Sequence, residues 1–186
     1  SKKRVLDLVN NLQKAFENRI SHLDWMSDST KVKAKEKLYT ITKKIGYPDK
    51  WRNYDKVQIN RTHYFENVLS LNRNDYQDEL AKLNKAVDRT EWHTTPSTVT
   101  AYYNPALNEI VFPAGILQYP YFDFSADDAI NYGGIGMVIG HELTHAFDDQ
   151  GAQYDKDGNV KNWWTKEDYR KFKERTQQLS ELYGSF

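Results

Sequence analysis

The stretch Gly140-His141-Glu142-Leu143-Thr144-His145 decides how the rest of the chain is interpreted. His141 and His145 are four residues apart, so on an α-helix both imidazoles lie on one face, about 6 Å apart. Two imidazoles in that arrangement can bind one zinc ion at nitrogen–metal distances of about 2.0–2.1 Å. The spacing therefore predicts a zinc site built on a helix, with His141 and His145 as two of its ligands.

Glu142 is the candidate base of this site. It lies about 100° round the helix from His141, so its carboxylate can reach a metal-activated water molecule rather than the metal. Zinc lowers the pKa of such a water from 15.7 to about 7, and the carboxylate can take its proton and later pass it to a leaving amine. This combination is typical of peptide hydrolysis. The apolar residues before the motif predict a buried helix; they are Ile135, Met137, Val138 and Ile139.

A third zinc ligand is not evident from spacing, although catalytic zinc usually has three protein ligands. Asp148 shares the face of the two histidines, but it lies about 10.5 Å along the axis from His141. We expect it to accept an imidazole N–H and orient the ring. A solvent-facing Asp148 stays open as the alternative. The histidine that a metzincin needs six residues after His145 is absent, because that position is Gly151.

Hydrophobic periodicity predicts an α+β chain, mostly helical, with a small β-hairpin next to the motif helix. The predicted strands are residues 98–103 and 109–112. Residues 1–90 are expected to form a helical segment that leads into the zinc-binding part, residues 91–186. The predicted helices are residues 5–23, 27–45 and 65–87, a long helix from a cap at 125–128 through His145 and beyond, which Gly151 can close, and 165–182.

Three of these helices carry predicted inner faces. They are Val32, Leu38, Ile41 and Ile45 in the second; Leu69, Tyr76, Leu80, Leu83 and Val87 in the third; and Tyr169, Phe172, Leu179 and Leu182 in the last. The glycines at positions 133, 134 and 136 are poor helix formers, and we expect them to allow another element to approach closely.

Composition limits the class of protein. The chain has 26 basic and 26 acidic residues, so nothing in its net charge favours nucleic acid or an anionic membrane as a partner. No apolar run approaches the roughly 20 residues that cross a bilayer. Cysteine is absent, while 13 Tyr, 8 Phe and 5 Trp provide bulky core material. These counts indicate a folded domain without disulfides.

Further motifs lie in order along nearly the whole chain. They read WMSDSTKVKAKEKL, IGYPD, VDRTEW, VTAYY, NEIVFPAGILQ, NYGGIG, GHELTHAFDDQG and DKDGNVKNWW. Through these residues the chain resembles the neprilysin and endothelin-converting enzyme family of zinc metallopeptidases, which are gluzincins. The resemblance implies a thermolysin-like half-domain, and an endopeptidase that cleaves small peptides before hydrophobic residues.

The resemblance also assigns roles to individual residues. It makes His141 and His145 zinc ligands, Glu142 the base, and Asp148 a partner of a ligand. It implies that the strand around Thr100 and Ala101 binds an extended peptide by edge pairing.

Three departures from the family pattern matter. Position 100 is usually Asn in the family, so the contact of that amide with substrate is in doubt here. The family's third ligand is a Glu in an ENxAD-type motif, which we expect beyond Phe186. The chain is therefore expected to be a fragment of the catalytic region, inactive alone and prone to self-association. The lack of cysteine favours a bacterial homologue that is periplasmic, attached to the cell surface or secreted, with a cytoplasmic protein as the alternative.

A second hypothesis is a non-catalytic module that captures peptides and holds zinc weakly or for structural purposes. Several other residues are expected to have structural roles only. His22, His63 and His93 match no ligand spacing, and residues 155–159 favour a glycine-containing turn over a calcium loop. Trp163 and Trp164 are expected in the core, with a binding platform as the alternative.

Overall fold

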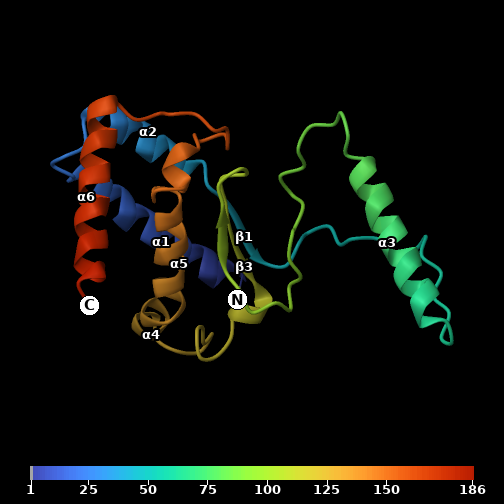
Figure 1. The fold of residues 1–186 in the computed structure, drawn as a ribbon. Helices are drawn as coiled ribbons and strands as arrows, with labels where there is room; N and C mark the ends of the chain where they lie inside the picture. The colour runs from blue at the N-terminus through green and yellow to red at the C-terminus, as the bar shows by residue number, and fades with distance from the viewer. Residues whose placement is uncertain (1) are drawn as a thin grey trace. The chain divides into compact units, whose positions relative to one another are not determined.

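Helix α5, Ile135–His145, carries the motif and packs against helix α1, Lys2–Ser21, and strand β2, Tyr102–Asn104 (Figure 1). These elements belong to a computed structural model that describes residues 2–186. One compact unit contains the residues up to Tyr47 together with Thr94–Phe186, and a second contains Pro48–His93. The expected division into a helical segment, residues 1–90, and a zinc-binding part, residues 91–186, stays a prediction.

The sheet of the first unit has three strands in the order β1-β3-β2. Strand β3, Glu109–Pro113, is central and buried along its whole length. It pairs in parallel with β1, Thr42–Gly46, and antiparallel with β2. Strand β2 is therefore paired on one side only within this sheet, and its other edge is open to further hydrogen bonding.

The predicted hairpin of β2 and β3 is confirmed, but its first strand is shorter than expected. Residues 98–101 lie outside β2 because the preceding chain binds another element. The amide of Gly115 donates to the Pro96 carbonyl at 2.8 Å, and a Cβ on Gly115 would meet the Thr98 carbonyl at 2.5 Å. Gly115 belongs to the 3₁₀ turn η1, Ala114–Ile116, so residues 96–98 contact this turn and not a strand.

The predicted helix over residues 27–45 is wrong after Tyr39. Helix α2 ends at Tyr39, and Ile45 lies in β1, where it is aligned with Phe112. Pairing with the buried strand β3 satisfies the backbone of residues 42–46, so tertiary structure overrides a weak helical pattern. Val32, assigned to the inner face of this helix, is 57% exposed.

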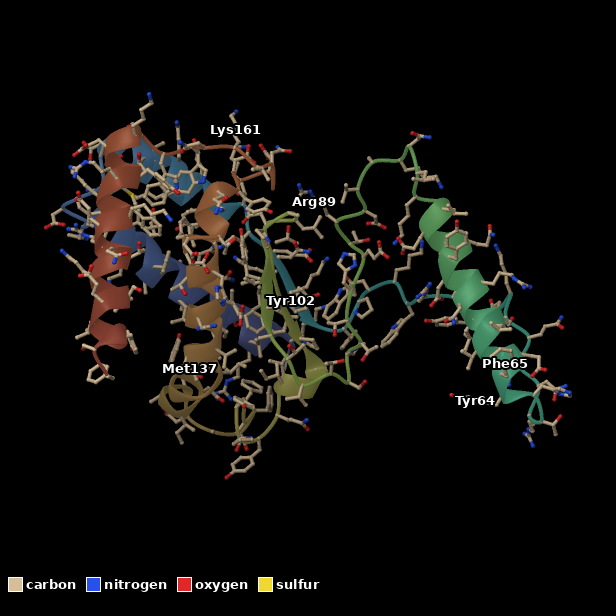
Figure 2. All side chains as sticks on the ribbon, in the orientation of Figure 1. Tyr64, Phe65, Arg89, Tyr102, Met137 and Lys161 are labelled. Carbon is tan, nitrogen blue, oxygen red and sulfur yellow. The ribbon has the colours of Figure 1, made fainter. Side chains whose placement is uncertain are left out.

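The third predicted helix forms, but its inner face does not. Helix α3, Tyr64–Leu80, has no buried residue, and Leu83 and Val87 lie beyond its end. Tyr64 and Phe65, labelled at the start of α3 in Figure 2, are 82% and 67% exposed. All five residues assigned to the inner face are exposed in the structure; they are Leu69, Tyr76, Leu80, Leu83 and Val87.

The long helix predicted before the motif is two helices. Helix α4, Asp128–Gly133, is capped by the Asp127 carboxylate, and Gly134 separates it from α5. The Tyr121 carbonyl accepts the Ile135 amide at 2.7 Å, and it would lie 2.4 Å from a Cβ on Gly134. The expected close approach thus occurs at Gly134. A Cβ on Gly133 would contact no neighbouring element, and one on Gly136 would lie 3.3 Å from the Tyr132 ring. Helix α5 ends at His145, and Gly151 instead begins the 3₁₀ turn η2, Gly151–Gln153.

The last helix begins where the sequence predicts. Thr165 caps helix α6, Lys166–Gly184, by accepting the Asp168 amide. Leu179 and Leu182 are 56% and 55% exposed, so the prediction of an inner face is wrong for the second half of α6. The core of the first unit instead gathers α1, α2, β1, β3 and α5 around Val5, Leu38, Ile110, Ile135 and Ile139. Among the described residues, no helix combines the length and apolar character that crossing a bilayer needs.

Candidate metal centre

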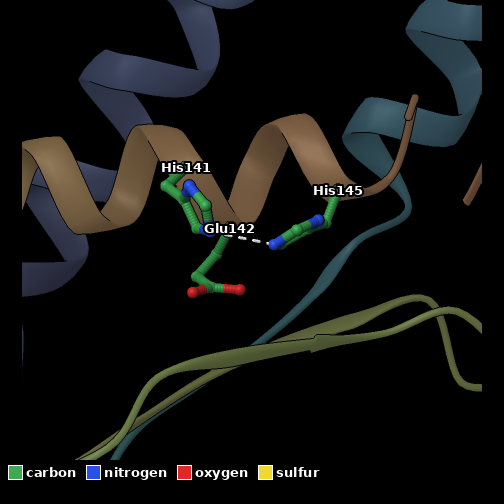
Figure 3. Close-up of side chains that lie close together, drawn as sticks. All are labelled: His141, Glu142 and His145. Carbon is green, nitrogen blue, oxygen red and sulfur yellow. Dashed lines mark hydrogen bonds between the residues drawn. The ribbon is translucent and has the colours of Figure 1, made fainter. Parts of the chain in front are cut away.

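Helix α5 brings His141, Glu142 and His145 into one cluster, with their ligand atoms within 4.8 Å of one another. Figure 3 shows the three side chains on the side of α5 that faces the strands. Ile135, Ile139 and Leu143 occupy the buried side of the helix, so the four-residue spacing places both imidazoles toward its exposed side. The apolar pattern therefore fixes which way the polar cluster points.

The two imidazoles already meet at the nitrogens that would bind a metal. His141 Nε2 and His145 Nε2 are 2.9 Å apart, and the rings are nearly perpendicular at 87°. Tetrahedral zinc with bonds of 2.0–2.1 Å separates two ligand nitrogens by about 3.3 Å. A movement of a few tenths of an ångström would accommodate the ion, so this donor set fits zinc.

Asp148 lies just beyond α5 and contacts the ring of His145. Its Oδ2 is 2.6 Å from His145 Nδ1, the nitrogen on the other side of the ring from His141. A carboxylate in that position accepts an N–H, which keeps the proton on Nδ1 and leaves Nε2 with a free lone pair. Asp148 is thus placed to orient the His145 ring. It contacts Nδ1 and not the Nε2 that meets His141, so its contribution to metal binding would be indirect.

Glu142 is 6% exposed and lies under the histidines, on the side of the sheet. Burial raises the pKa of its carboxyl, while both histidines and a hydrogen bond from the Tyr103 backbone act in the opposite direction. Tyr103 belongs to the edge strand β2. The structure therefore places a proton-accepting group between the candidate metal ligands and an open strand edge.

The turn after α5 is held by polar contacts that the sequence did not predict. Asp148 Oδ1 accepts the amides of Gln150 and Gly151 at 3.0 and 2.7 Å. Lys37 of α2 donates to three carbonyl groups of the same region at 2.6–2.7 Å. Burial lowers the pKa of Lys37 to about 8, against the opposing effect of Asp155 and Asp148. One feature of the sequence could have indicated that Lys37 is buried. It lies at helical spacing from Thr30 and Ala34 and next to Leu38, which are the other buried residues of α2.

Two family models match this chain, both described as Peptidase family M13. One covers residues 1–48 and the other covers residues 100–186, which include the histidine pair and Asp148. The chain belongs to peptidase family M13. This confirms the resemblance to neprilysin and the endothelin-converting enzymes, and it agrees with an α+β part of a metallopeptidase.

Named M13 relatives align along the whole chain. Endothelin-converting enzyme 1 of Bos taurus is 45% identical and neprilysin of Oryctolagus cuniculus is 42% identical; each alignment covers 100% of this chain and 26% of the relative. The zinc metalloprotease Zmp1 of Mycobacterium tuberculosis, solved in complex with an inhibitor, matches with a TM-score of 0.93. It is 54% identical, and the match covers 100% of this chain and 28% of that one. The chain thus spans about a quarter of the length of these peptidases.

Thr100 and Ala101, the predicted substrate-binding residues, lie just before β2 in this M13 chain and are half-buried. The Thr100 hydroxyl donates weakly to the Ala101 carbonyl at 3.4 Å. Thr100 and Ala101 therefore precede strand β2 and are not part of it.

The three histidines outside the motif, the two tryptophans and the turn of residues 155–159 all lie outside the cluster of His141, Glu142 and His145. His22, His63 and His93 are exposed, and His22 contacts the Asn18 carbonyl at 2.8 Å. Trp163 and Trp164 are each 7% exposed and contribute to the core. The Asp155 carboxylate accepts the amides of Asp157 and Asn159, which closes a turn around Gly158.

Proposed function

We propose that the complete polypeptide containing this chain is a zinc-dependent endopeptidase that hydrolyses small peptides before hydrophobic residues. The observation that carries the proposal is the meeting of His141 Nε2 and His145 Nε2 at 2.9 Å, with Glu142 in the same cluster, in an M13 chain. Endothelin-converting enzyme 1 and neprilysin, which align along the entire chain, favour peptides as the substrate class.

In this proposal His141 and His145 bind zinc through Nε2. The bound ion would supply Lewis acidity, which polarises the scissile carbonyl and makes water a stronger acid. Glu142 takes a proton from the attacking water and then passes it to the amine that leaves. The Asp148 carboxylate holds the proton of His145 on Nδ1, so that Nε2 keeps its lone pair for the metal.

The peptide substrate would extend along β2 as an added strand. Two features support this: β2 pairs with β3 on one side only, and the backbone of Tyr103 on β2 reaches Glu142. A peptide paired with that edge passes the carboxylate with its backbone extended. Thr100 and Ala101, next in the chain, would then contact the residues of the peptide on one side of the cleaved bond.

We infer a third zinc ligand, a Glu, in the part of the polypeptide beyond Phe186. Glu142 acts as the base in this scheme, and it is the one carboxylate that joins the histidines in the described cluster, so a further ligand has to come from elsewhere. The chain alone, with two imidazole ligands, would hold zinc weakly and turn over no substrate. One zinc ion per catalytic site is expected.

We also propose a bacterial protein that works in the periplasm, at the cell surface or outside the cell, with the cytoplasm as the alternative. The absence of cysteine from the chain and the similarity to the Mycobacterium tuberculosis enzyme support a bacterial origin. A balanced charge of 26 basic and 26 acidic residues gives no reason to expect nucleic acid as a partner.

A second candidate is a peptide-binding module that does not catalyse. Thr100 in place of the family's usual Asn, and the two-histidine donor set, favour it. Titration of the complete polypeptide with an unlabelled hydrophobic peptide separates the candidates: saturable binding without cleavage products supports the module.

The test of the endopeptidase is hydrolysis of an internally quenched peptide with a hydrophobic residue after the cleaved bond. The complete polypeptide is expected to cleave it, to stop in the presence of a zinc chelator, and to recover when zinc is added back. Cleavage that persists in the chelator, or the absence of any cleavage in zinc-loaded protein, would overturn the proposal.

A further inference from the structure

Lys37 is among the largest fully buried side chains of the described residues, at 1% exposure, although lysine is almost always exposed. Its ammonium group donates to the carbonyls of Ala146, Gly151 and Tyr154 at 2.7, 2.6 and 2.6 Å. These three bonds use every N–H that a lysine carries. The side chain spans from α2 to the turn that follows α5, so its contacts gather on one short segment.

The surroundings of the ammonium explain why a charge is tolerated there. The rings of Tyr103, Phe147 and Trp163 lie 5.7–6.0 Å from Nζ and enclose it on several sides. The Ala146 carbonyl follows the last turn of α5, where carbonyl groups lack partners within the helix and the helix dipole is negative. Lys37 thus supplies a positive cap to the helix that carries the histidines.

Gly151 connects Lys37 to the metal centre through a single residue. Its carbonyl accepts from Lys37 Nζ at 2.6 Å, and its amide donates to Asp148 Oδ1 at 2.7 Å. Asp148 Oδ2 in turn contacts His145 Nδ1 at 2.6 Å. A Cβ on Gly151 would lie 1.8 Å from the His145 carbonyl, so the turn folds tightly back on the end of α5. The chain of contacts from Lys37 to the imidazole is unbroken.

We propose that Lys37 is a positioning residue for the metal centre: it fixes the turn of residues 146–154, and thereby the Asp148 carboxylate that orients His145. The inference rests on the proposed zinc function. Without the ammonium, the carbonyls of Ala146, Gly151 and Tyr154 would lose a shared donor, and the Asp148 carboxylate would sample other positions. The His145 ring would then meet zinc with less preorganisation.

The test is a double-mutant cycle of Lys37→Met and Asp148→Ala in the complete polypeptide, read as the zinc dissociation constant in competition with a chromophoric chelator. Removal of a group that orients a ligand typically weakens metal binding about 10–100-fold. We expect about a tenfold loss for Lys37→Met, and less than about a twofold further loss when it is added to Asp148→Ala, because both act through one carboxylate.

Lys43→Met is the matched control. Lys43 also places a half-buried ammonium between elements, where it donates to Asn10 and Gln13 of α1 at 2.8 and 2.6 Å. Its loss should lower thermal stability and leave zinc affinity unchanged. A role of Lys37 in stability alone predicts the same result for Lys37→Met, and that result would overturn the inference.

The experiment distinguishes a failure of the proposed zinc function from a failure of the proposed role of Lys37. Wild-type protein that binds no zinc overturns both, whereas tight zinc binding in wild type and Lys37→Met alike overturns only the positioning role. If Lys37→Met does not fold, Lys37→Gln, which keeps two N–H donors on a shorter side chain, replaces it in the cycle. An additive loss in the folded variant, independent of Asp148, also contradicts the inference.

Discussion

Glu142 is surrounded by groups that suit a base rather than a ligand. It is almost fully buried beside two histidines, and the Tyr103 backbone holds its carboxylate on the side of the sheet. Because Nε2 of both histidines already meet without it, the metal can bind before the carboxylate is used. At the scale of single residues, the proposal therefore assigns metal binding to the two histidines and proton transfer to Glu142.

Substitution Glu142→Gln tests that separation. The amide keeps the size of the side chain but cannot accept the proton, so kcat of the complete polypeptide should fall by at least about 10²–10⁴-fold. Zinc content, measured by atomic absorption, should stay equal to wild type. Loss of zinc together with activity would identify Glu142 as a ligand instead.

Thr100→Asn tests the peptide-binding role of the segment before β2. Asn supplies the amide expected from the family pattern, and a gained hydrogen bond contributes about 1 kcal/mol, or roughly fivefold in affinity. KM for a small peptide should fall by about that factor while kcat changes little. An unchanged KM would show that position 100 does not contact the substrate.

Two helices meet at Asp168, and this contact governs stability at the scale of elements. The carboxylate accepts the Thr30 and Thr165 hydroxyls at 2.6 and 2.7 Å and the Ser27 amide at 3.0 Å. Ser27 precedes α2, and Thr165 caps α6. One buried side chain therefore joins the starts of both helices.

The acid stability of the chain should depend on this residue. Burial raises the pKa of Asp168, but hydrogen bonds from Ser27, Thr30 and Thr165 outweigh it and lower the pKa to about 2. Since the unfolded value is near 3.9, the stabilisation is complete above about pH 4 and is lost as the pH falls toward 2. Asp168→Asn should lower the free energy of unfolding by about 2 kcal/mol at pH 7, with the difference shrinking below pH 4. Urea unfolding across pH 2–7 measures this; a difference that does not depend on pH would contradict it.

Local patterns predicted the elements whose stabilising groups are close in sequence. Thr165 and Asp168 form their cap within one turn, and His141 and His145 meet because a helix alone places them together. Strand β1 was missed because its hydrogen-bond partner, β3, lies more than 60 residues away. The break at Gly134 was also missed, because the carbonyl that accepts the Ile135 amide belongs to Tyr121, outside both helices.

Lys37 shows why the polar part of the site was only partly predictable. In the sequence it is one of four lysines within Lys31–Lys37, which is typical of a solvated helix face. Its partners are backbone carbonyls from Ala146 to Tyr154, and backbone groups leave no signature in composition. Asp148 was predictable because its partner, His145, lies three residues away.

At the scale of the whole molecule, the chain leaves much apolar surface uncovered. On α6 and its end, Leu179, Leu182, Tyr183 and Phe186 are 55–97% exposed. Isolated monomers rarely expose apolar residues in such a group, so this helix face favours association.

The isolated 186-residue chain is therefore expected to self-associate. Sedimentation velocity should show species larger than 21.9 kDa whose fraction grows with concentration. Leu179→Glu combined with Leu182→Glu should shift the distribution toward monomer, while Lys3→Glu, at an exposed position of α1, serves as the control. A monomer at all concentrations would contradict the prediction.

The position of the metal is the most direct test of the whole account. Crystals of the complete polypeptide grown with zinc should give an anomalous difference peak at the zinc edge within about 2.0–2.1 Å of both His141 Nε2 and His145 Nε2. The Glu142 carboxylate should lie nearby without a direct bond to the ion. A peak at another location, or histidine rings turned away from each other with no peak between them, would contradict the account.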